Sequence, residues 1–179
     1  NVPGGKWTVM RFGKRNNGAV TRPAPVPGLG FECDKTDTVA FNNHFAEYVG
    51  KLIRKTGKEA KKSDRGWTML HMDSWEMGAQ NWGANFREEF RQRRGYDPLP
   101  FLPVYQGMVV ESPEVSERFL WDLRKTAGEL VIANHAEHLK KLCRRYGFGL
   151  SIEPYDMNPV ADLDLGAVAD VPMCEFWSK

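Results

Sequence analysis

One stretch of the sequence, residues 66–82, holds the side chains that most readily suggest chemistry. Its apolar run over 67–72 predicts a buried strand. The run ends in two acids, a hydroxyl and an aromatic, which are Asp73, Ser74, Trp75 and Glu76. Carboxylates move protons during glycosidic bond cleavage, and flat aromatic side chains stack on sugar rings. A strand that ends in an ordinary solvated turn would look the same, so the other strand ends must decide between these two interpretations.

Three further predicted strands end in polar, charged or aromatic side chains. These strands cover 6–12, 148–152 and 171–174, and their ends carry Arg11, then Glu153 with Tyr155 and Asp156, then Glu175 with Trp177. Three of the four ends therefore combine an acid with a nearby aromatic. Parallel strands bring their carboxyl ends to one rim, where ligands bind in open α/β sheets and in (β/α)8 barrels. We therefore expect one shared site at this rim.

The elements that must position these side chains alternate between strand and helix. Apolar residues at helical spacing predict helices within 36–56, 84–94, 113–146 and 161–169, with Thr36 or Asp37 as the first cap and a break of the long helix near Gly128. The pattern is a strand followed by a helix four times over, and the last helix is missing. Such alternation predicts an α/β fold with a parallel sheet and right-handed crossovers.

A long loop rich in proline and glycine separates the first predicted strand from the first helix. It runs to about Lys35 and ends in the charged cluster Glu32-Cys33-Asp34-Lys35. Loops of this length in compact domains are usually functional or disordered. The charged cluster beside a helix start favours a functional loop.

The clustered acids suit glycoside hydrolysis in particular. One carboxylic acid protonates the leaving oxygen, and a second carboxylate either activates water or attacks the sugar; the gap is about 5–5.5 Å for retention and about 6.5–9.5 Å for inversion. Neighbouring carboxylates raise the pKa of one member, which keeps the acid protonated. Surplus carboxylates could hold Ca²⁺, which prefers hard oxygen ligands.

Composition and motifs argue against several other classes of function. The 179 residues include 25 basic and 23 acidic side chains, and the net charge of +2 gives no broad field for nucleic acid or an anionic membrane. No apolar run is long enough to predict a transmembrane helix. The three cysteines are far apart and predict neither a disulfide framework nor a zinc site. No glycine-rich phosphate loop follows any predicted strand.

The histidines and Ser74 have plainer interpretations. His135 and His138 are expected to be solvated or packed on the long helix rather than metal ligands. His71 alternates within an apolar strand, which favours a hydrogen-bonded core histidine over a ligand. Ser74 has no neighbouring base in the sequence, so a nucleophilic Ser-His-Asp triad is not expected.

Several blocks of the sequence resemble glycoside hydrolase family 106, the α-L-rhamnosidases. The resemblance begins at Asp73-Ser74-Trp75-Glu76 with Gln80-Asn81-Trp82. It extends over nearly the whole chain through blocks at 11–13, 23–25, 34–35, 93–97, 116–122 and 152–155. It implies a (β/α)8 catalytic domain in a larger bacterial enzyme that is secreted or periplasmic. It also implies hydrolysis of terminal α-L-rhamnose from plant polysaccharides or glycosides, with inversion and an active-site Ca²⁺.

The resemblance also implies roles for individual residues. Glu76 would be the general acid or base, Glu153 its leading partner, and Glu175 a metal ligand or an alternative partner. Sugar would be bound by Asp73, Arg11, Lys35 and Tyr155, and the aromatic rings of Trp75 and Trp177 would stack on it.

The length of the chain limits how much of such a barrel it can contain. A full (β/α)8 barrel takes about 250 residues, so we expect residues 1–179 to be the first half of one catalytic domain, with about four β/α units and the rest of the parent polypeptide elsewhere. The chain starts at Asn1 without a signal-like segment, as expected of a processed product or an excised piece. Two alternatives stay open: a non-catalytic carbohydrate-binding half-barrel, and a glycosidase with another sugar specificity.

Overall fold

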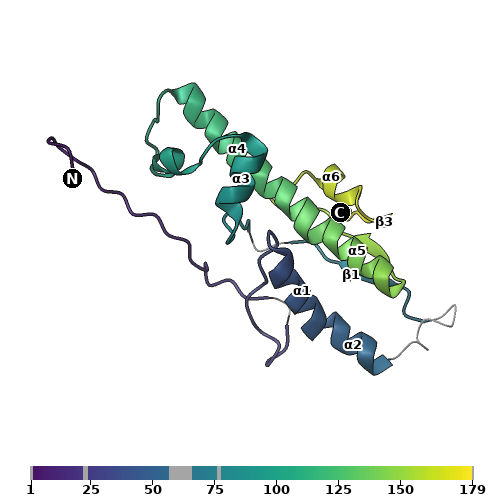
Figure 1. Cartoon of the computed structure of the whole chain (residues 1–179). Coiled ribbons are helices and arrows are strands. Elements are labelled where there is room, and N and C mark those ends of the chain that lie inside the picture. Colours follow the sequence, from purple (N-terminus) through teal and green to yellow (C-terminus); the bar gives the residue numbers. More distant parts are fainter. Residues whose placement is uncertain (1, 22–23, 57–65, 76–77, 179) are drawn as a thin grey trace.

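The chain builds a small parallel sheet with helices packed along it (Figure 1). The computed structural model describes residues 2–21, 24–56, 66–75 and 78–178. The strands are β1 (Met69–Met72), β2 (Gly149–Ile152) and β3 (Val171–Pro172). The helices are α1 (Thr38–Glu47), α2 (Val49–Thr56), α3 (Phe86–Arg94), the 3-10 helix η2 (Leu99–Gln106), α4 (Pro113–Val131), the π-helical segment η3 (Ile132–Ala136), α5 (Glu137–Tyr146) and α6 (Asp162–Gly166).

The predicted parallel sheet is confirmed, in the order β1-β2-β3. Alternate residues of β1 point to opposite faces, as the period of a strand requires, so Leu70 and Met72 are buried whereas Met69 and His71 are exposed. The register pairs His71 with Ser151 and Met72 with Ile152. The carboxyl ends of β1 and β2 therefore lie level with each other.

The predicted first strand, residues 6–12, is wrong. This segment is extended but joins no described strand, and it leads away from the sheet to the N-terminal end of the chain (Figure 1). Its large apolar side chains are exposed, with Trp7 at 60% and Val9 at 93%. Strand propensity alone cannot form a strand without a neighbour to accept its hydrogen bonds. Among the described residues the sheet thus has three strands rather than the expected four.

The first predicted helix is divided in two at Tyr48. Its predicted cap is confirmed at Asp37, whose Oδ1 accepts a hydrogen bond from the Val39 amide at 2.8 Å. Tyr48 has φ −109° and ψ −81°, outside the helical region, so α1 ends there and α2 begins at Val49. The apolar stripe expected over 41–53 therefore spans two helices.

The long predicted helix over 113–146 is confirmed, with Ser112 as its cap. Ser112 Oγ accepts a hydrogen bond from the Val115 amide at 3.2 Å. The break predicted near Gly128 is wrong, because the helix continues through it. The irregularity is instead the π-helical segment η3, which is a short widening of the helix that proteins often place at functional sites.

Two hydrophobic clusters meet along this helix. One lies between α3, η2 and α4 and includes Phe90 and Leu130, and the other lies under the sheet and includes Val131 and Leu150. The adjacent residues Leu130 and Val131 thus face different clusters. A π-helical turn shifts the buried face of a helix relative to the turns before it, so η3 lies where α5 takes over the packing against the sheet. None of the described helices is long and apolar enough to cross a membrane.

Candidate active site

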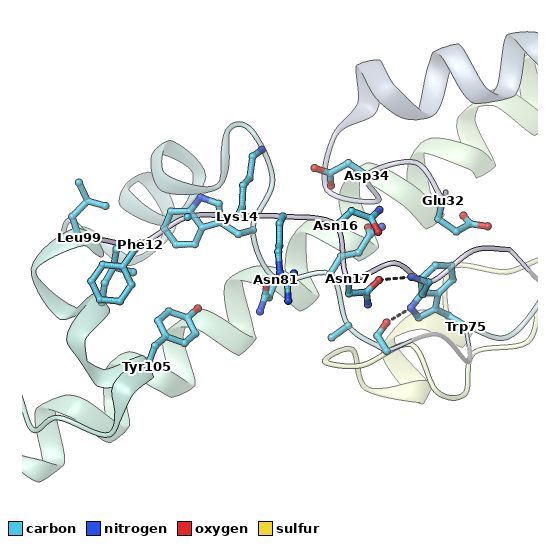
Figure 2. A pocket seen from close by; sticks show the side chains of 18 residues that line it. Phe12, Lys14, Asn16, Asn17, Glu32, Asp34, Trp75, Asn81, Leu99 and Tyr105 are labelled. Carbon is cyan, nitrogen blue, oxygen red and sulfur yellow. Dashed lines mark hydrogen bonds between the residues drawn. The ribbon is translucent and has the colours of Figure 1, made fainter. Parts of the chain in front are cut away.

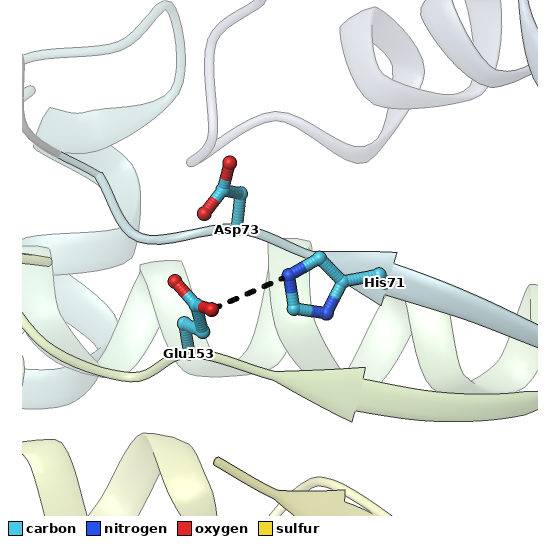
Figure 3. A group of neighbouring side chains, drawn as sticks. All are labelled: His71, Asp73 and Glu153. Carbon is cyan, nitrogen blue, oxygen red and sulfur yellow. Dashed lines mark ion pairs between the residues drawn. The ribbon is translucent and has the colours of Figure 1, made fainter. Parts of the chain in front are cut away.

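Three titratable side chains gather at the carboxyl ends of β1 and β2. His71 and Asp73 are two residues apart and share one face of their strand, and Glu153 follows β2 on the same rim (Figure 3). One ligand-type atom from each of the three lies within 4.8 Å of the other two. The sequence-based prediction of a shared rim is therefore confirmed for Asp73 and Glu153, and the structure adds His71.

His71 is oriented by hydrogen bonds through β2. Its Nδ1 lies 2.9 Å from Ser151 Oγ, and the Ser151 hydroxyl in turn contacts the Leu70 carbonyl at 3.4 Å. With that hydroxyl donating to Leu70, the His71 Nδ1–H donates to Ser151, which leaves Nε2 facing Glu153 Oε1 at 3.7 Å. The prediction of a hydrogen-bonded histidine is thus confirmed. The prediction of a core position is wrong, because 43% of the side chain is exposed.

Tyr155 fixes the carboxylate of Glu153. The Tyr155 hydroxyl donates a hydrogen bond to Glu153 Oε2 at 2.6 Å. This hydrogen bond, together with desolvation and the negative charges of Glu153, Glu175 and Asp73, raises the pKa of Tyr155 well above its ordinary value. The phenol is therefore neutral at physiological pH, and it keeps the proton that it donates to Glu153.

Lys35 lies beside this cluster but is already engaged. It is only 4% exposed, and its Nζ lies 3.1 Å from Glu32 Oε2 and 3.9 Å above the centre of the Trp75 ring. Its backbone amide donates to Gln80 Oε1 at 2.7 Å, and Gln80 Nε2 donates to the Cys33 carbonyl at 3.0 Å. The side chain of Gln80 thus holds the end of the long loop through one backbone amide and one backbone carbonyl, the two groups that a neighbouring strand would otherwise bond.

The remaining predicted site residues lie farther along the chain. Glu175 and Trp177 follow β3 and are exposed, and Glu175 is close enough to influence the pKa of Tyr155. Arg11 is exposed in the extended N-terminal segment, which leads away from the sheet (Figure 1). Glu76, the leading catalytic candidate, lies outside the described residues.

A hollow of about 730 Å³ lies beside the rim, between β1, α1 and α2. Its lining includes the polar side chains of Glu32, Lys35, His71, Asp73 and Ser74, together with apolar and aromatic side chains such as Phe41, Leu52, Trp67 and Trp75. A site of this composition can hold a sugar-sized polar group against an apolar wall.

His135 also lines this hollow, from η3. It is 6% exposed, packs edge-on against the ring of Phe41 at 4.7 Å, and its Nδ1 has no hydrogen-bond partner in the described part of the chain. Burial, followed by the positive charge of Lys35, lowers the pKa of His135 well below its ordinary value, so the ring is neutral. His138 contacts Asn42 Oδ1 at 2.7 Å. The prediction that both histidines are packed or solvated is thus borne out.

The rim cluster can transfer protons and bind a cation. Two carboxylates and an imidazole stand within reach of one reacting group, and the Glu153 carboxylate is held in place by Tyr155. Acid–base hydrolysis requires such proton-donating and proton-accepting groups. In the sequence, the only signal for His71 was its position two residues before Asp73. Side chains two residues apart lie on the same face of a strand, and the structure shows that this face of β1 is exposed.

Comparison with known proteins identifies the relatives of this chain. A sequence model of glycoside hydrolase family 106, described as alpha-L-rhamnosidase, matches residues 1–179. A curated protein from Formosa agariphila, named "Putative beta-glucuronidase", is 39% identical over 179 residues, which cover 99% of this chain and 15% of that protein. The solved structure of a rhamnosidase from Novosphingobium sp. PP1Y matches with a TM-score of 0.76 and 30% identity, covering 84% of this chain and 14% of the other. The chain thus spans about one seventh of the length of these relatives.

Proposed function

Because this chain belongs to glycoside hydrolase family 106, the alpha-L-rhamnosidase family, we propose that it forms part of the catalytic domain of a glycosidase that removes terminal α-L-rhamnose. We propose further that the domain is a (β/α)8 barrel, to which this chain contributes the first β/α units. Three parallel strands joined through helices support this proposal, as does the similarity to a solved rhamnosidase. The single observation that carries the function is the joining of Asp73 and Glu153 at one strand-end rim.

In the proposed mechanism two carboxylates divide the proton transfers. Glu76 acts as general acid and protonates the glycosidic oxygen as the bond to the sugar carbon breaks. Glu153 acts as general base and takes a proton from the water that attacks that carbon from the opposite face, which inverts its configuration. Glu153 suits the role of base because the Tyr155 hydroxyl donates to its Oε2 at 2.6 Å, which fixes the carboxylate and leaves Oε1 to face the reacting water.

Neighbouring residues would hold the sugar and exclude water. Asp73 offers a carboxylate to sugar hydroxyls, and Trp75 with Trp177 offer aromatic surface. Lys35 lies over Trp75 and next to Glu32, so it would act by orienting these two side chains. Arg11 would reach the sugar only if the N-terminal segment folded toward the rim.

We also propose a Ca²⁺ ion at this rim. Asp73 fits such an ion, since it places hard carboxylate oxygens on the rim beside His71, and Glu175, which is near enough to influence Tyr155, would add a second carboxylate. When bound, the ion would supply positive charge that fixes sugar hydroxyls in place. The parent enzyme is proposed to be bacterial and secreted or periplasmic, in keeping with the family resemblance.

Kinetics of the full-length protein that carries this chain test the proposal. We expect Glu76→Gln and Glu153→Gln each to lower kcat on an aryl α-L-rhamnoside by about 10²–10⁴-fold, because each removes one proton transfer. Glu137→Gln, at an exposed position on α5 that does not line the hollow beside the rim, is the matched control. Proton NMR of the first product formed reports the anomer, and inversion requires β-L-rhamnose. Near-normal turnover of both variants would refute the assignment, and binding of rhamnose without hydrolysis by the unaltered protein would favour a carbohydrate-binding role.

A glycosidase of another sugar specificity is the second candidate. The curated relative named "Putative beta-glucuronidase" favours it, since that name implies a different sugar. A panel of aryl glycosides that includes the β-glucuronide, assayed beside the α-L-rhamnoside, separates the two candidates.

A further inference from the structure

The buried imidazole of His135 takes no part in the proposed mechanism, although it lines the hollow beside the rim. It belongs to η3, and π-helical segments are frequent at functional sites. The side chain is 6% exposed, and its Nδ1 has no hydrogen-bond partner among the described residues. A buried nitrogen without a partner destabilises a fold, so a histidine at this position needs an explanation other than packing.

His135 lies at the junction between η3 and α1. Its ring packs edge-on against Phe41 of α1, with 4.7 Å between the two ring centroids. One residue earlier, Asn134 donates a hydrogen bond to the Thr36 carbonyl at 2.7 Å. The segment η3 therefore holds both α1 and the turn that precedes it.

This junction also sets the position of Lys35, which directly precedes Thr36 in the chain. The Lys35 ammonium lies 3.9 Å above the centre of the Trp75 ring and 3.1 Å from Glu32 Oε2. Trp75 and Lys35 both line the hollow beside the rim. A movement of α1 away from η3 would therefore separate Lys35 from Trp75 and change the wall of the candidate active site.

The surroundings of His135 oppose a positive charge on its ring. Burial, followed by the positive charges of Lys35, His44 and His138, lowers the pKa of His135 well below its ordinary value. No described carboxylate forms an ion pair with this ring. The other titratable groups around the junction are exposed or already paired; they are Glu32, His71, Asp73, Glu129, Glu137, Asp162 and Asp164. A proton taken up by His135 would thus add a buried charge without a counter-charge.

We propose that His135 is a positioning residue: its neutral imidazole keeps α1 and Lys35 in place beside Trp75, and protonation of the imidazole opens this junction. The proton comes from solvent and binds to the free lone pair of the ring. This inference rests on the proposed function and adds to it a residue outside the rim cluster, through which acid weakens the binding of sugar.

The direction of the effect follows from the two states of the junction. In the open junction the ring meets water, where a histidine has a pKa of about 6.5. The closed junction resists the proton, so the open form gains population as the pH falls below about 6.5, by about ten-fold for each pH unit. Above that pH the imidazole is neutral in both states, and the population of the open form is constant.

Hydrogen exchange measured by mass spectrometry tests the junction in the full-length protein that carries this chain. Peptides that span 33–41 are compared at each pH between the unaltered protein and His135→Phe, which keeps an aromatic ring beside Phe41 and takes up no proton. We expect the exchange rate of the unaltered protein, divided by that of His135→Phe, to rise by about ten-fold per pH unit below about 6.5. His135→Leu, whose side chain is smaller, gives a second comparison that does not depend on the fit of the larger ring.

A matched variant controls for the loss of any histidine near the junction. His44→Gln removes an exposed histidine of α1 that lines the same hollow, and the rise in exchange at acid pH should be retained. The proposal is overturned if the exchange ratio is independent of pH with both His135→Phe and His135→Leu. It is equally overturned if His44→Gln abolishes the rise.

Kinetics separate a positioning role from a role in folding alone. From neutral pH to the lowest pH at which both proteins stay folded, KM for an aryl α-L-rhamnoside should rise several-fold more in the unaltered protein than in His135→Phe. The change in kcat should be the same in both, because the proton transfers belong to other residues. A difference confined to kcat contradicts the proposal. If the unaltered protein cleaves no rhamnoside, the proposed function fails, whereas the hydrogen exchange comparison still decides whether His135 controls the junction.

Discussion

At the scale of single residues, the rim depends on how each polar side chain is held. Tyr155 holds the Glu153 carboxylate by a hydrogen bond, and Ser151 holds the His71 imidazole. Both side chains of the rim are therefore oriented by residues of β2 or of the turn after it. Lys35 is held by Glu32 and Trp75 instead of projecting into solvent. A site whose side chains are already oriented loses less freedom when it binds its substrate.

The pairing of Tyr155 with Glu153 predicts a measurable titration. The Glu153 carboxylate raises the pKa of Tyr155 through a hydrogen bond and through its negative charge. Glu153→Gln removes that charge, so we expect the pKa of Tyr155 to fall toward its ordinary value of about 10. Carbon-13 NMR of tyrosine labelled at Cζ at position 155 follows this titration in the full-length protein. With Glu137→Gln as the control background, an unchanged titration in Glu153→Gln would contradict the pairing.

At the scale of elements, the loop before α1 is joined to the loop before α3. Gly83 lies against Asp34 and Thr36 so closely that a Cβ at position 83 would come within 2.3 Å of Thr36 Oγ1 and 2.7 Å of Asp34 Oδ2. The absence of a side chain at Gly83 therefore allows the Asp34–Thr36 hydrogen bonds that precede α1. Asn134, on η3, completes this junction by donating to the Thr36 carbonyl at 2.7 Å.

Gly83→Ala should break this junction. We expect it to lower the free energy of unfolding by about 1–3 kcal/mol, as overpacking usually does. Hydrogen exchange measured by mass spectrometry should show faster exchange in peptides that span 33–41. Gly30→Ala is the control, because a Cβ there would meet no heavy atom within 4 Å and the backbone is not left-handed. Equal exchange in the two variants would show that the close approach at Gly83 is unimportant.

At the scale of the whole molecule, the described sheet is open, because no further described strand pairs with either of its outer strands. β1 and β3 are its outer strands, and the residues around β3 expose apolar side chains, with Phe176 at 87% and Trp177 at 84%. Outer strands with exposed apolar residues invite pairing with other chains. In the parent protein these surfaces would be covered by the rest of the proposed barrel.

The isolated chain of 179 residues should therefore self-associate. We expect sedimentation velocity to show dimers or larger species whose proportion rises with concentration. Phe176→Ser/Trp177→Ser should reduce that proportion, since it removes the two most exposed aromatic side chains after β3. Val9→Ser, which removes an exposed apolar group from the N-terminal segment, is the comparison. A sharply melting monomer at all concentrations would contradict the incomplete-barrel proposal.

Local signals in the sequence predicted much of the fold. The caps at Asp37 and Ser112 were predicted from side chains that bond to the next few amides, and helix spacing predicted α3 and the long helix. The strand at 6–12 was wrong because a strand depends on a neighbour. The π-helical segment was also missed, because η3 follows two adjacent residues, Leu130 and Val131, that pack in different hydrophobic clusters.

For the candidate site, the sequence by itself determined which acids follow which strands, and a parallel sheet then required Asp73 and Glu153 to share a rim. Only the tertiary structure decided the partners: His71 faces Glu153 at 3.7 Å, Tyr155 restrains that carboxylate, and Lys35 is buried against Trp75. The hollow of about 1060 Å³ that is lined by both Lys14 and Gln80 also joins segments that are 66 residues apart in the chain (Figure 2). The physical reason is one of range, since caps, turns and strand period act over a few residues, whereas ion pairs and hollows depend on contacts between distant segments that no local pattern specifies.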